Sequence, residues 1–406
     1  MFNTVKRAFP RNVSTRSMSW GVKKMNYSVE MLNKDIPREI TGNKYGIPYR
    51  VVNERAVFST SSNSAVPKKD TKNTHVFELS FKKNIIVSGK DSKHFVDKMV
   101  TCDNKIMEVG HTCKSLMLNE SGSIIGLGLV NKFQHYYSLI MESETDKNNL
   151  LMDHLFENVG NHDVIVSKNT LDEIFLVSGL ESTEVIKKIQ RHLIPSTLPN
   201  CSVIDNLAYH QNVKFTNQFV PNNTFSVINT PLGYYFTINK IIKNNLFNNL
   251  KVEISSNDIY HKKRIEYALP DYNKDIGLKY NPIEANLQSY FARSYKHSKR
   301  NPIGTNFIGK EGVFTGYGKF KRFKKTRVIM YSCKKGLIPP PNSNIFLEDK
   351  KVGKVTSSVY SDYLNCIVSM GYINLFDTFS TRSFSLAREM ARKVSINGTE
   401  YFIRFI

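Results

Sequence analysis

Basic side chains gathered in two short segments form the most concentrated chemical feature of the sequence. These basic segments are Arg293, Lys296, Lys299 and Arg300, followed by Lys319, Lys321, Arg322, Lys324, Lys325 and Arg327 with Phe320 and Phe323 between them. Lysine and arginine pair with phosphates, and aromatic rings stack on bases, which is how proteins hold single-stranded nucleic acid. The same charge suits an acidic carrier protein, because complementary charge speeds association. No recognised nucleic-acid-binding module accompanies the segments, so nucleic acid is disfavoured relative to a protein partner or a plain solvated surface.

The five cysteines give no sign of a metal site or a disulfide framework. They are Cys102, Cys113, Cys201, Cys333 and Cys366, and no two of them form a C-x-x-C pair. Scattered cysteines in odd number are typical of small core residues in a reducing compartment. We therefore expect no bound metal.

The balance of charged and apolar residues indicates a soluble protein of several domains. Lys and Arg total 57 against 35 Asp and Glu, a net charge of +22 over 406 residues, and 40% of the residues are hydrophobic. A chain of this length and composition can bury a core and is expected to divide into two or three domains. Its longest uncharged apolar stretch, 123–130, is far shorter than the roughly 20 residues that span a membrane. These features exclude a disordered polycation and a membrane-spanning helix, and we expect a monomer.

The first 29 residues form a basic, serine-containing leader without an acid, since Glu30 is the first acidic residue. Phe2, Val5 and Phe9 recur at helical spacing among its basic residues. An acid-free amphipathic segment of this kind resembles a mitochondrial targeting peptide. We therefore predict a transit peptide at 1–29 and a location in the mitochondrial matrix, with an ordinary basic tail as the alternative.

The hydrophobic pattern after the leader predicts α+β layers followed by an all-β domain. After a polar loop at 53–73, pairs of strands alternate with single helices, which indicates mainly antiparallel sheets covered by helices. The expected strands are 76–81, 84–89, 115–118, 124–130, 136–141, 163–167 and 174–177, and the expected helices begin near 91, 146 and 183. Short strands separated by Gly, Pro and Asn turns then predict a small β-barrel or sandwich. These later strands are 328–331, 345–347, 355–359, 366–369 and 401–406.

Five segments along the chain resemble the motifs of one known family. They are Phe77-Glu-Leu-Ser with Ile85-Ile-Val-Ser-Gly-Lys-Asp, Leu116-Met-Leu-Asn-Glu-Ser-Gly-Ser, Arg264-Ile-Glu-Tyr-Ala-Leu with Asp275-Ile276, Asn306-Phe-Ile-Gly-Lys-Glu, and Val352-Gly-Lys-Val-Thr-Ser with Met370-Gly-Tyr-Ile. In order and spacing they are similar to the T-protein of the glycine cleavage system, the aminomethyltransferase family. The resemblance covers nearly all of the chain after the leader.

The resemblance implies an α+β, three-domain cloverleaf. Its first two domains are ferredoxin-like, antiparallel αβ domains that interleave along the chain, and its third is a small C-terminal β-barrel. On this basis the chain divides into the leader at 1–29, a folate-binding αβ region at 30–300, and the barrel domain at 301–406. A central hole takes tetrahydrofolate, and the lipoyl arm of the H-protein enters from the opposite side.

The activity implied by the resemblance is transfer of an aminomethyl group from the lipoyl sulfur of the H-protein to N5 of tetrahydrofolate. The reaction releases ammonia and gives 5,10-methylenetetrahydrofolate, with tetrahydrofolate as co-substrate and no metal. The protein must hold the donor carbon beside a weakly basic nitrogen and place a carboxylate that favours attack by that nitrogen. The cofactors carry the remaining chemistry.

Acids expected from the resemblance are missing from this chain. The family continues its hairpin motif with two aspartates, the first of which is its chief catalytic carboxylate. This chain has Gly126, Leu127 and Gly128 there, and Gly126 occupies the position of the catalytic aspartate. The segment 230–237 lacks the family's pterin-binding glutamate. Glu120 and Asp275 are the candidate substitutes, although both are expected to be solvated turn or cap residues. The catalytic residue is therefore unknown, and the alternative function is a T-protein-like scaffold that binds folate or the carrier without catalysis.

The remaining site residues also follow from the resemblance. The expected folate-binding residues are Tyr401, Tyr260, Tyr235, Leu116 and Asn119. Tyr260 stands where the family has an arginine. The alternative role for Tyr401 is that of an ordinary aromatic residue in a barrel strand. The expected carrier-docking residues are Arg293, Lys296, Lys321 and Arg322. Arg264 and Glu266 are expected to form a structural pair. The related iron–sulfur assembly branch is disfavoured, because the segment 303–311 lacks that branch's cysteine.

Overall fold

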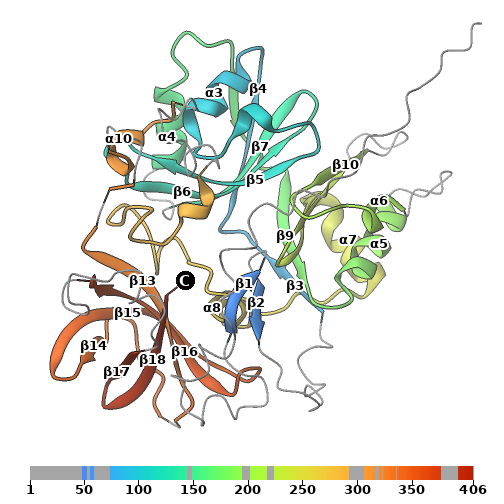
Figure 1. The fold of residues 1–406 in the computed structure, drawn as a ribbon. Helices are drawn as coiled ribbons and strands as arrows, with labels where there is room; N and C mark the ends of the chain where they lie inside the picture. Colours follow the sequence, from blue (N-terminus) through green and yellow to red (C-terminus); the bar gives the residue numbers. More distant parts are fainter. Residues whose placement is uncertain are drawn as a thin grey trace, which may run out of the picture.

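The computed structural model describes residues 48–52, 55–58, 74–143, 149–193, 202–216, 224–291, 306–315, 320–321, 323–334, 336–375 and 392–405. The predicted transit peptide at 1–29 lies outside this part of the chain. Figure 1 shows three groups of elements around the centre of the molecule, formed mainly by residues 83–168, 172–250 and 325–405. The predicted α+β class is confirmed.

The first group is an antiparallel sheet, here called sheet I, with the strand order β5-β6-β7-β4-β8. Its strands are β4 (Lys83–Ser88), β5 (Thr112–Leu118), β6 (Ile124–Lys132), β7 (Tyr136–Ser143) and β8 (Ile165–Lys168). Helices α3 (Ser92–Met99) and α4 (Leu150–Glu157) pack on one face of the sheet, and the short helix η1 (Asn104–Ile106) follows α3. The apolar face predicted for the first helix is confirmed, because Phe95, Val96 and Met99 are all buried.

The second group, sheet II, has the strand order β10-β11-β12-β9-β3 and is also antiparallel. Its strands are β3 (His75–Glu78), β9 (Asp172–Ser178), β10 (Asn212–Thr216), β11 (Thr224–Thr230) and β12 (Gly233–Asn239). Helices α5 (Ser182–Leu193), α6 (Ser202–Asp205) and α7 (Lys240–Leu250) accompany it. The Asn239 side chain caps α7 by accepting a hydrogen bond from the backbone N of Ile241 at 2.9 Å.

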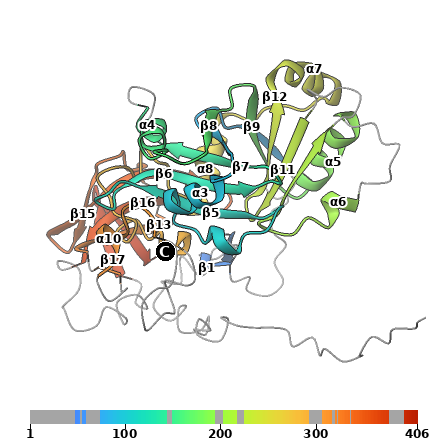
Figure 2. The same ribbon diagram turned by 90° about the horizontal axis from the view of Figure 1, so that it is seen from above.

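Sheets I and II pack against each other through the faces that their helices leave uncovered. Residues of both sheets share one apolar cluster, which contains Leu129 and Ile140 of sheet I and Ile174, Leu176 and Ile228 of sheet II. Figure 2 shows the two sheets side by side, with α5 and α7 on the outer side of sheet II. The chain passes between the sheets twice, since β3 joins sheet II, β4 to β8 build sheet I, and β9 returns to sheet II.

The third group is a closed barrel with the strand order β13-β16-β15-β14-β17-β18. Its strands are β13 (Lys325–Ser332), β14 (Asn344–Leu347), β15 (Lys350–Ser361), β16 (Cys366–Asn374), β17 (Arg392–Ile396) and β18 (Thr399–Phe405). The predicted C-terminal barrel is therefore confirmed. Along the chain, three short elements separate the last strand of sheet II from the barrel. They are α8 (Asn257–Glu266), η2 (Gln288–Tyr290) and α10 (Lys310–Val313).

The predicted polar loop at 53–73 is wrong over its first residues. Strand β1 (Pro48–Val52) pairs with β2 (Arg55–Phe58) in a two-stranded antiparallel ribbon. The pairing satisfies backbone groups that a loop would leave to water. The rest of the expected loop, from 59 to 73, is outside the described residues.

Two glycine-containing segments, far apart in the sequence, touch backbone to backbone. A Cβ atom on Gly309 would lie 2.3 Å from the carbonyl oxygen of Asn119, and one on Gly312 would lie 2.1 Å from that of Ser121. Gly122, in the same turn, has a φ of +82°, a conformation that favours glycine. The β5–β6 turn and the start of α10 therefore approach each other at a distance that no side chain permits.

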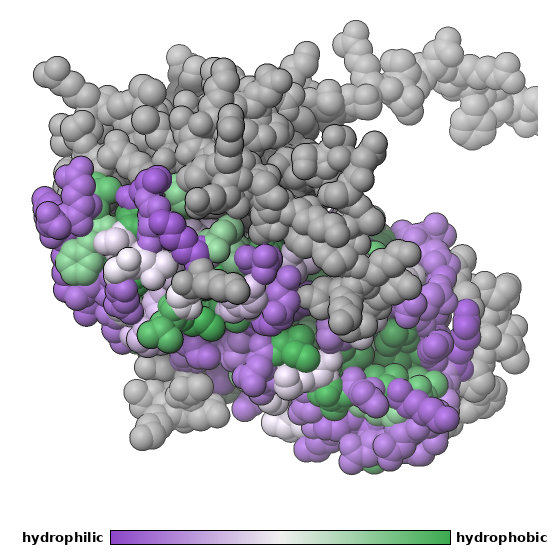
Figure 3. All heavy atoms as spheres, turned by 90° about the horizontal axis from the view of Figure 1, so that it is seen from below, coloured by the Kyte–Doolittle hydropathy of each residue, from purple (hydrophilic) through white to green (hydrophobic). Residues whose placement is uncertain are grey.

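No helix in the described ranges is long and apolar enough to cross a membrane. The described part of the face seen in Figure 3 is largely hydrophilic, with hydrophobic residues in small patches. Singly exposed apolar residues of this kind are common on folded proteins.

Candidate functional site

A buried ion pair joins Lys82, in the turn between β3 and β4, to Glu142 on β7. The Lys82 Nζ atom donates to Glu142 Oε2 at 2.7 Å, and the two side chains are only 9% and 6% exposed. The other oxygen, Oε1, accepts a hydrogen bond from the backbone N of Tyr272 at 2.7 Å. Burial on its own lowers the pKa of Lys82, but Glu142 raises it well above its ordinary value overall. Lys82 is therefore charged at neutral pH, and both carboxylate oxygens of Glu142 are held in fixed positions.

Three tyrosines surround the Lys82–Glu142 pair. Tyr235 comes from β12, Tyr260 from α8 and Tyr290 from η2, and the electrostatic environment of each includes both members of the pair. Burial raises the pKa of all three phenols, that of Tyr290 to about 12. Within the described residues their hydroxyls have no hydrogen-bond partner, so three protonated phenols are available to a ligand.

A further amine lies at the edge of this site. Lys114 Nζ on β5 is 5.5 Å from the ring centroid of Tyr290. Burial lowers the pKa of Lys114 to about 8. Lys114 therefore exchanges its proton near physiological pH, unlike an exposed lysine.

The structure brings together three of the residues predicted from the sequence to bind folate. Tyr235 and Tyr260 lie in one apolar cluster between the sheets and α8. Leu116 is fully buried in the neighbouring cluster, against which Tyr290 packs. Sequence reasoning missed Lys82 and Glu142. The signal that could have pointed to Glu142 was that it is the single charged residue in the largely apolar segment Tyr136–Ser143.

Two other predicted folate contacts lie elsewhere. Tyr401 is fully buried inside the barrel with Val328 and Ile403, so its position fits an ordinary barrel aromatic and not a ligand contact. The Asn119 side chain stabilises its own turn, because its Oδ1 accepts hydrogen bonds from Ser121 Oγ at 2.7 Å and Ser123 N at 2.8 Å.

Glu120, the predicted weak substitute for the missing catalytic acid, is exposed in the β5–β6 turn. A catalytic carboxylate must lie in the site, whereas the turn packs against the start of α10. Among the predicted docking residues, Lys321 is exposed, and Arg293, Lys296 and Arg322 are outside the described residues.

Gly126 is at a β-bulge of β6. A Cβ atom there would lie 3.0 Å from Leu151 Cδ1 and 3.6 Å from Met117 Cβ, on the face covered by α4. Leu127 is on the opposite face, in the same cluster as Tyr272, and is the direct cross-strand partner of Glu142. A side chain at 127, and not one at 126, would thus point toward the Lys82–Glu142 site.

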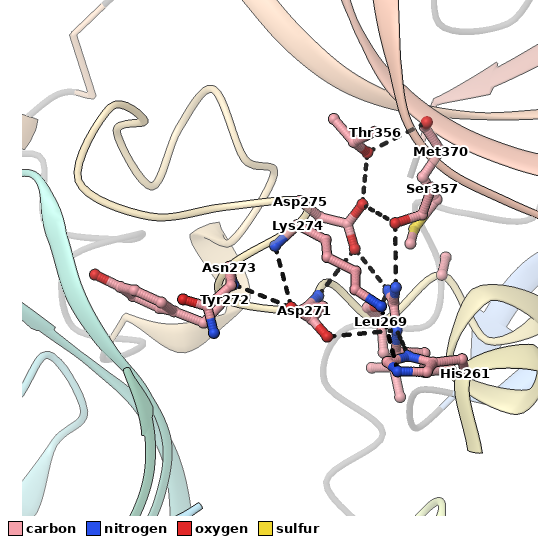
Figure 4. A network of polar contacts seen from close by, with 12 residues as sticks. His261, Leu269, Asp271, Tyr272, Asn273, Lys274, Asp275, Thr356, Ser357 and Met370 are labelled. Atoms are coloured by element: carbon pink, nitrogen blue, oxygen red, sulfur yellow. Dashed lines mark hydrogen bonds and ion pairs between the residues drawn. The ribbon is translucent and has the colours of Figure 1, made fainter. Parts of the chain in front are cut away.

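Asp275 is wholly buried, so the expectation of a solvated turn residue is wrong. Figure 4 shows its carboxylate within a network that joins the segment after α8 to the barrel. Arg264 Nη1 donates to Oδ2 at 2.6 Å, while the hydroxyls of Thr356 and Ser357 donate to Oδ1 at 2.5 and 2.7 Å. The expected Arg264–Glu266 pair is therefore also wrong, because Asp275 is the partner of Arg264. Asp275 holds two parts of the fold together.

The described residues contain no group of three or more His, Cys, Asp or Glu side chains that could hold a metal ion. The polar groups of the site are one ammonium, one carboxylate and three phenols. Such a set can bind and orient a polar organic ligand through hydrogen bonds and fixed charges.

Two facing antiparallel sheets, a C-terminal barrel and a buried polar site between them define an α+β protein. The GCVT N-terminal domain family matches residues 61–212. Aminomethyltransferase from Thermosipho melanesiensis is 25% identical over 74% of this chain and 78% of its own length, and the one from Alkaliphilus oremlandii is 26% identical over 71% and 75%. These matches support the glycine cleavage T-protein, or aminomethyltransferase, family for this chain.

A solved structure shows the same fold. The crystal structure of glycine cleavage system aminomethyltransferase T from Bartonella henselae is similar with a TM-score of 0.62 and 16% identity, and the match covers 90% of this chain and 93% of that one. The order of sheets and barrel is therefore the architecture of this family.

Proposed function

We propose that the protein transfers an aminomethyl group from a lipoylated H-protein to tetrahydrofolate with release of ammonia, and that Glu142 supplies the carboxylate for this reaction. The observation that carries the proposal is the buried Lys82–Glu142 pair, 2.7 Å apart, with both sheets and the segment leading to the barrel contributing residues around it. Leu127, which replaces an acid of the family, is directly opposite Glu142.

The residues of the site fit a folate. Its pterin ring presents a row of hydrogen-bond donors and acceptors, and the phenols of Tyr235, Tyr260 and Tyr290 offer donors without a partner among the described residues. The apolar side chains of Leu116 and Leu127 suit the flat faces of such a ring. When bound, tetrahydrofolate supplies the nitrogen that accepts the carbon, and the lipoyl arm supplies the donor.

Glu142 acts as a fixed negative charge. Because Lys82 and the Tyr272 backbone N hold its two oxygens, the carboxylate does not reorient during the reaction. Its charge stabilises positive charge that develops as the aminomethyl carbon leaves sulfur. Burial of the pair excludes water, which strengthens this electrostatic effect.

The direct test is formation of 5,10-methylenetetrahydrofolate from aminomethyl-loaded H-protein. We expect turnover by the natural chain and a loss of about 10²-fold or more in Glu142→Gln, the size typical of removing one preorganised electrostatic group. Glu120→Gln makes the same change at an exposed carboxylate and is the matched control. Equal activity of Glu142→Gln and Glu120→Gln would disprove the role of Glu142.

A folate- or carrier-binding scaffold without transferase activity is the second candidate. The observation that favours it is that both oxygens of Glu142 already have protein partners, while Leu127 brings no charge. This candidate predicts saturable tetrahydrofolate binding with no product from the natural chain. Product formation at a rate above that of the free reactants would exclude it.

We also propose docking of the H-protein at the basic segments and residence in the mitochondrial matrix. The exposed position of Lys321 supports the first, and the acid-free composition of 1–29 supports the second. Fusion of residues 1–29 to a fluorescent protein tests targeting, with diffuse fluorescence as the contrary result. A fall in H-protein affinity with rising salt tests docking.

A further inference from the structure

A cavity of ≈ 230 Å³ lies between sheets I and II, apart from the Lys82–Glu142 site. Its lining residues are Asn84, Ile86, Phe133, Tyr136, Ser138, Asn169, Asp172, Lys214, Ser226 and Thr237. The volume is below the roughly 300–1,000 Å³ of sites for drug-sized ligands, so the cavity suits a smaller molecule.

The apolar contact between the sheets separates this cavity from the proposed folate site. On β7, Ser138 lines the cavity, Ile140 belongs to the apolar cluster, and Glu142 belongs to the ion pair. On β12, Thr237 lines the cavity, while Tyr235 belongs to the site. Residues two apart on a strand point to the same side and are about 7 Å apart. On β7 and on β12, the residue that lines the cavity and the residue of the Lys82–Glu142 site therefore lie on the same face.

Sheet II provides a polar wall that ends in a cation. Lys214, Ser226 and Thr237 are aligned across β10, β11 and β12 by the strand register. Ser226 Oγ and Thr237 Oγ1 are 2.6 Å apart, and both residues are more than nine-tenths buried. Only one of the two hydroxyls can donate to the other, so the second hydrogen and the remaining lone pairs are free for a ligand.

Sheet I provides a buried amide on the opposite wall. Ser138 Oγ donates to Asn84 Oδ1 at 2.8 Å, and both residues are 5% exposed. This bond fixes the amide, whose Nδ2 has no acceptor among the described residues. Because Asn84 lines the cavity, a ligand oxygen there could accept a hydrogen bond from this amide.

Aromatic rings and the cation form one end of the cavity. Phe133 and Tyr136 stack with their ring centroids 4.9 Å apart, and the Lys214 Nζ atom is 5.2 Å from the Tyr136 ring centroid. The described residues include no carboxylate in an ion pair with Lys214, which is exposed. At another part of the lining, Asn169 holds the Asp172 carboxylate at 2.9 Å.

We propose that this cavity binds a small monosaccharide phosphate. The phosphate pairs with Lys214, and the sugar ring packs on the Phe133–Tyr136 pair. The sugar hydroxyls bond to the Ser226–Thr237 hydroxyls and the Asn84 amide. Asp172 accepts a hydrogen bond from a hydroxyl remote from the phosphate, which sets the direction of the ligand. Lys214 alone attracts any anion, so free phosphate is the competing source of the same chemistry.

Isothermal titration of the full-length protein with ribose 5-phosphate tests the proposal, with ribose and inorganic phosphate as separate arms. We expect saturable binding of ribose 5-phosphate and at least tenfold weaker binding of either part. Lys214→Met and Thr237→Val should each weaken binding about tenfold, the size of one lost charged or buried hydrogen bond. Lys168→Met is the matched control, because Lys168 is exposed and is the strand partner of Ile85, whose side chain lies in the helix-covered core.

Three results would overturn the proposal. Absence of saturable binding, equal binding of inorganic phosphate, or an equal loss in Lys168→Met would do so. Ser226→Ala serves as a second, milder change if Thr237→Val does not fold. The titration contains no folate or H-protein, so its failure leaves the proposed transferase activity untouched, and failure of that activity leaves this binding measurable.

Discussion

Glu142 on β7 is directly opposite Leu127 on β6, and the side chains of both leave the same face of sheet I. Gly126, one residue earlier, faces Leu151 on the other side. Facing side chains on neighbouring strands have Cβ atoms about 5 Å apart. The acid present at 142 is therefore one strand away from position 127, where the family resemblance leads us to expect an acid that is absent.

Moving the carboxylate between these strands should move the activity with it. We expect Glu142→Gln to lose product formation and the double variant Leu127→Asp/Glu142→Gln to regain at least a tenth of it, because the charge returns to the same face. Gly126→Asp in the Glu142→Gln background is the control and should regain none, since its side chain would point toward Leu151. Recovery by Gly126→Asp instead would contradict the assignment of faces.

Breaking the Lys82–Glu142 pair should cost more stability than removing both charges. Lys82→Met leaves a buried carboxylate without its counter-ion, and we expect a loss of about 3–5 kcal/mol. In Lys82→Met/Glu142→Gln the amide oxygen still accepts from the Tyr272 backbone N, so the double variant should be more stable than Lys82→Met alone. Urea unfolding of the natural chain, Lys82→Met, Glu142→Gln and the double variant gives the comparison. Additive losses would show that the pair is not coupled.

The contact between the β5–β6 turn and α10 should tolerate no side chain. Gly312→Ala would put a Cβ atom 2.1 Å from a backbone oxygen, and we expect destabilisation of about 1–3 kcal/mol, typical of overpacking. Gly126→Ala would meet only the end of the Leu151 side chain at 3.0 Å and should cost less. Thermal unfolding midpoints of the two variants check the order, and a reversed order would refute it.

Lys114 should make stability rise with pH over a defined window. Burial lowers its folded-state pKa from 10.5 to about 8, so between these values the unfolded chain binds more protons than the folded chain. Stability therefore increases as the pH rises through this range. Lys114→Met should flatten the increase between pH 8 and 10 in denaturant unfolding. An unchanged slope would mean that Lys114 does not titrate in this range.

Asp275 should be required to hold the barrel to the rest of the chain. Asp275→Asn removes the closer charge partner of the buried Arg264 guanidinium and leaves only Asp271 at 3.9 Å, and we expect a loss of about 3 kcal/mol. Thr356→Val removes one hydrogen bond to the same carboxylate and should cost about 1 kcal/mol. Chemical unfolding compares the two. A similar small loss in both would indicate that the ion pair contributes little.

Sequence pattern predicted the layers of this fold because alternation and turn residues are local signals. The apolar face of α3 and the β5–β6 hairpin follow from them directly. The sequence pattern did not predict strands β10 to β12. One reason is that the faces they turn toward sheet I carry polar residues such as Ser226 and Thr237, which line a cavity and not an apolar core. Polar residues on a buried face remove the alternation on which the prediction depends.

The site was predictable only in part, because sequence spacing does not say which way a strand residue faces. Tyr235 and Tyr260 were found through the family resemblance, whereas Tyr401 points into the barrel. One bulged residue near Gly126 shifts the whole assignment of faces on β6. The partners of Asp275, Thr356 and Ser357, are more than 80 residues away along the chain, and no local pattern encodes such a pairing.

The contact of Gly309 and Gly312 with the 119–122 turn has a consequence for recognising related proteins. Two of the five segments that identify the family are the two sides of this one backbone contact. Because this contact builds the scaffold and carries no reacting group, a match at these glycines speaks for the fold and not for catalysis. If Glu142 supplies the carboxylate as proposed, positions 126, 127 and 142 are the residues by which such a collection should be sorted.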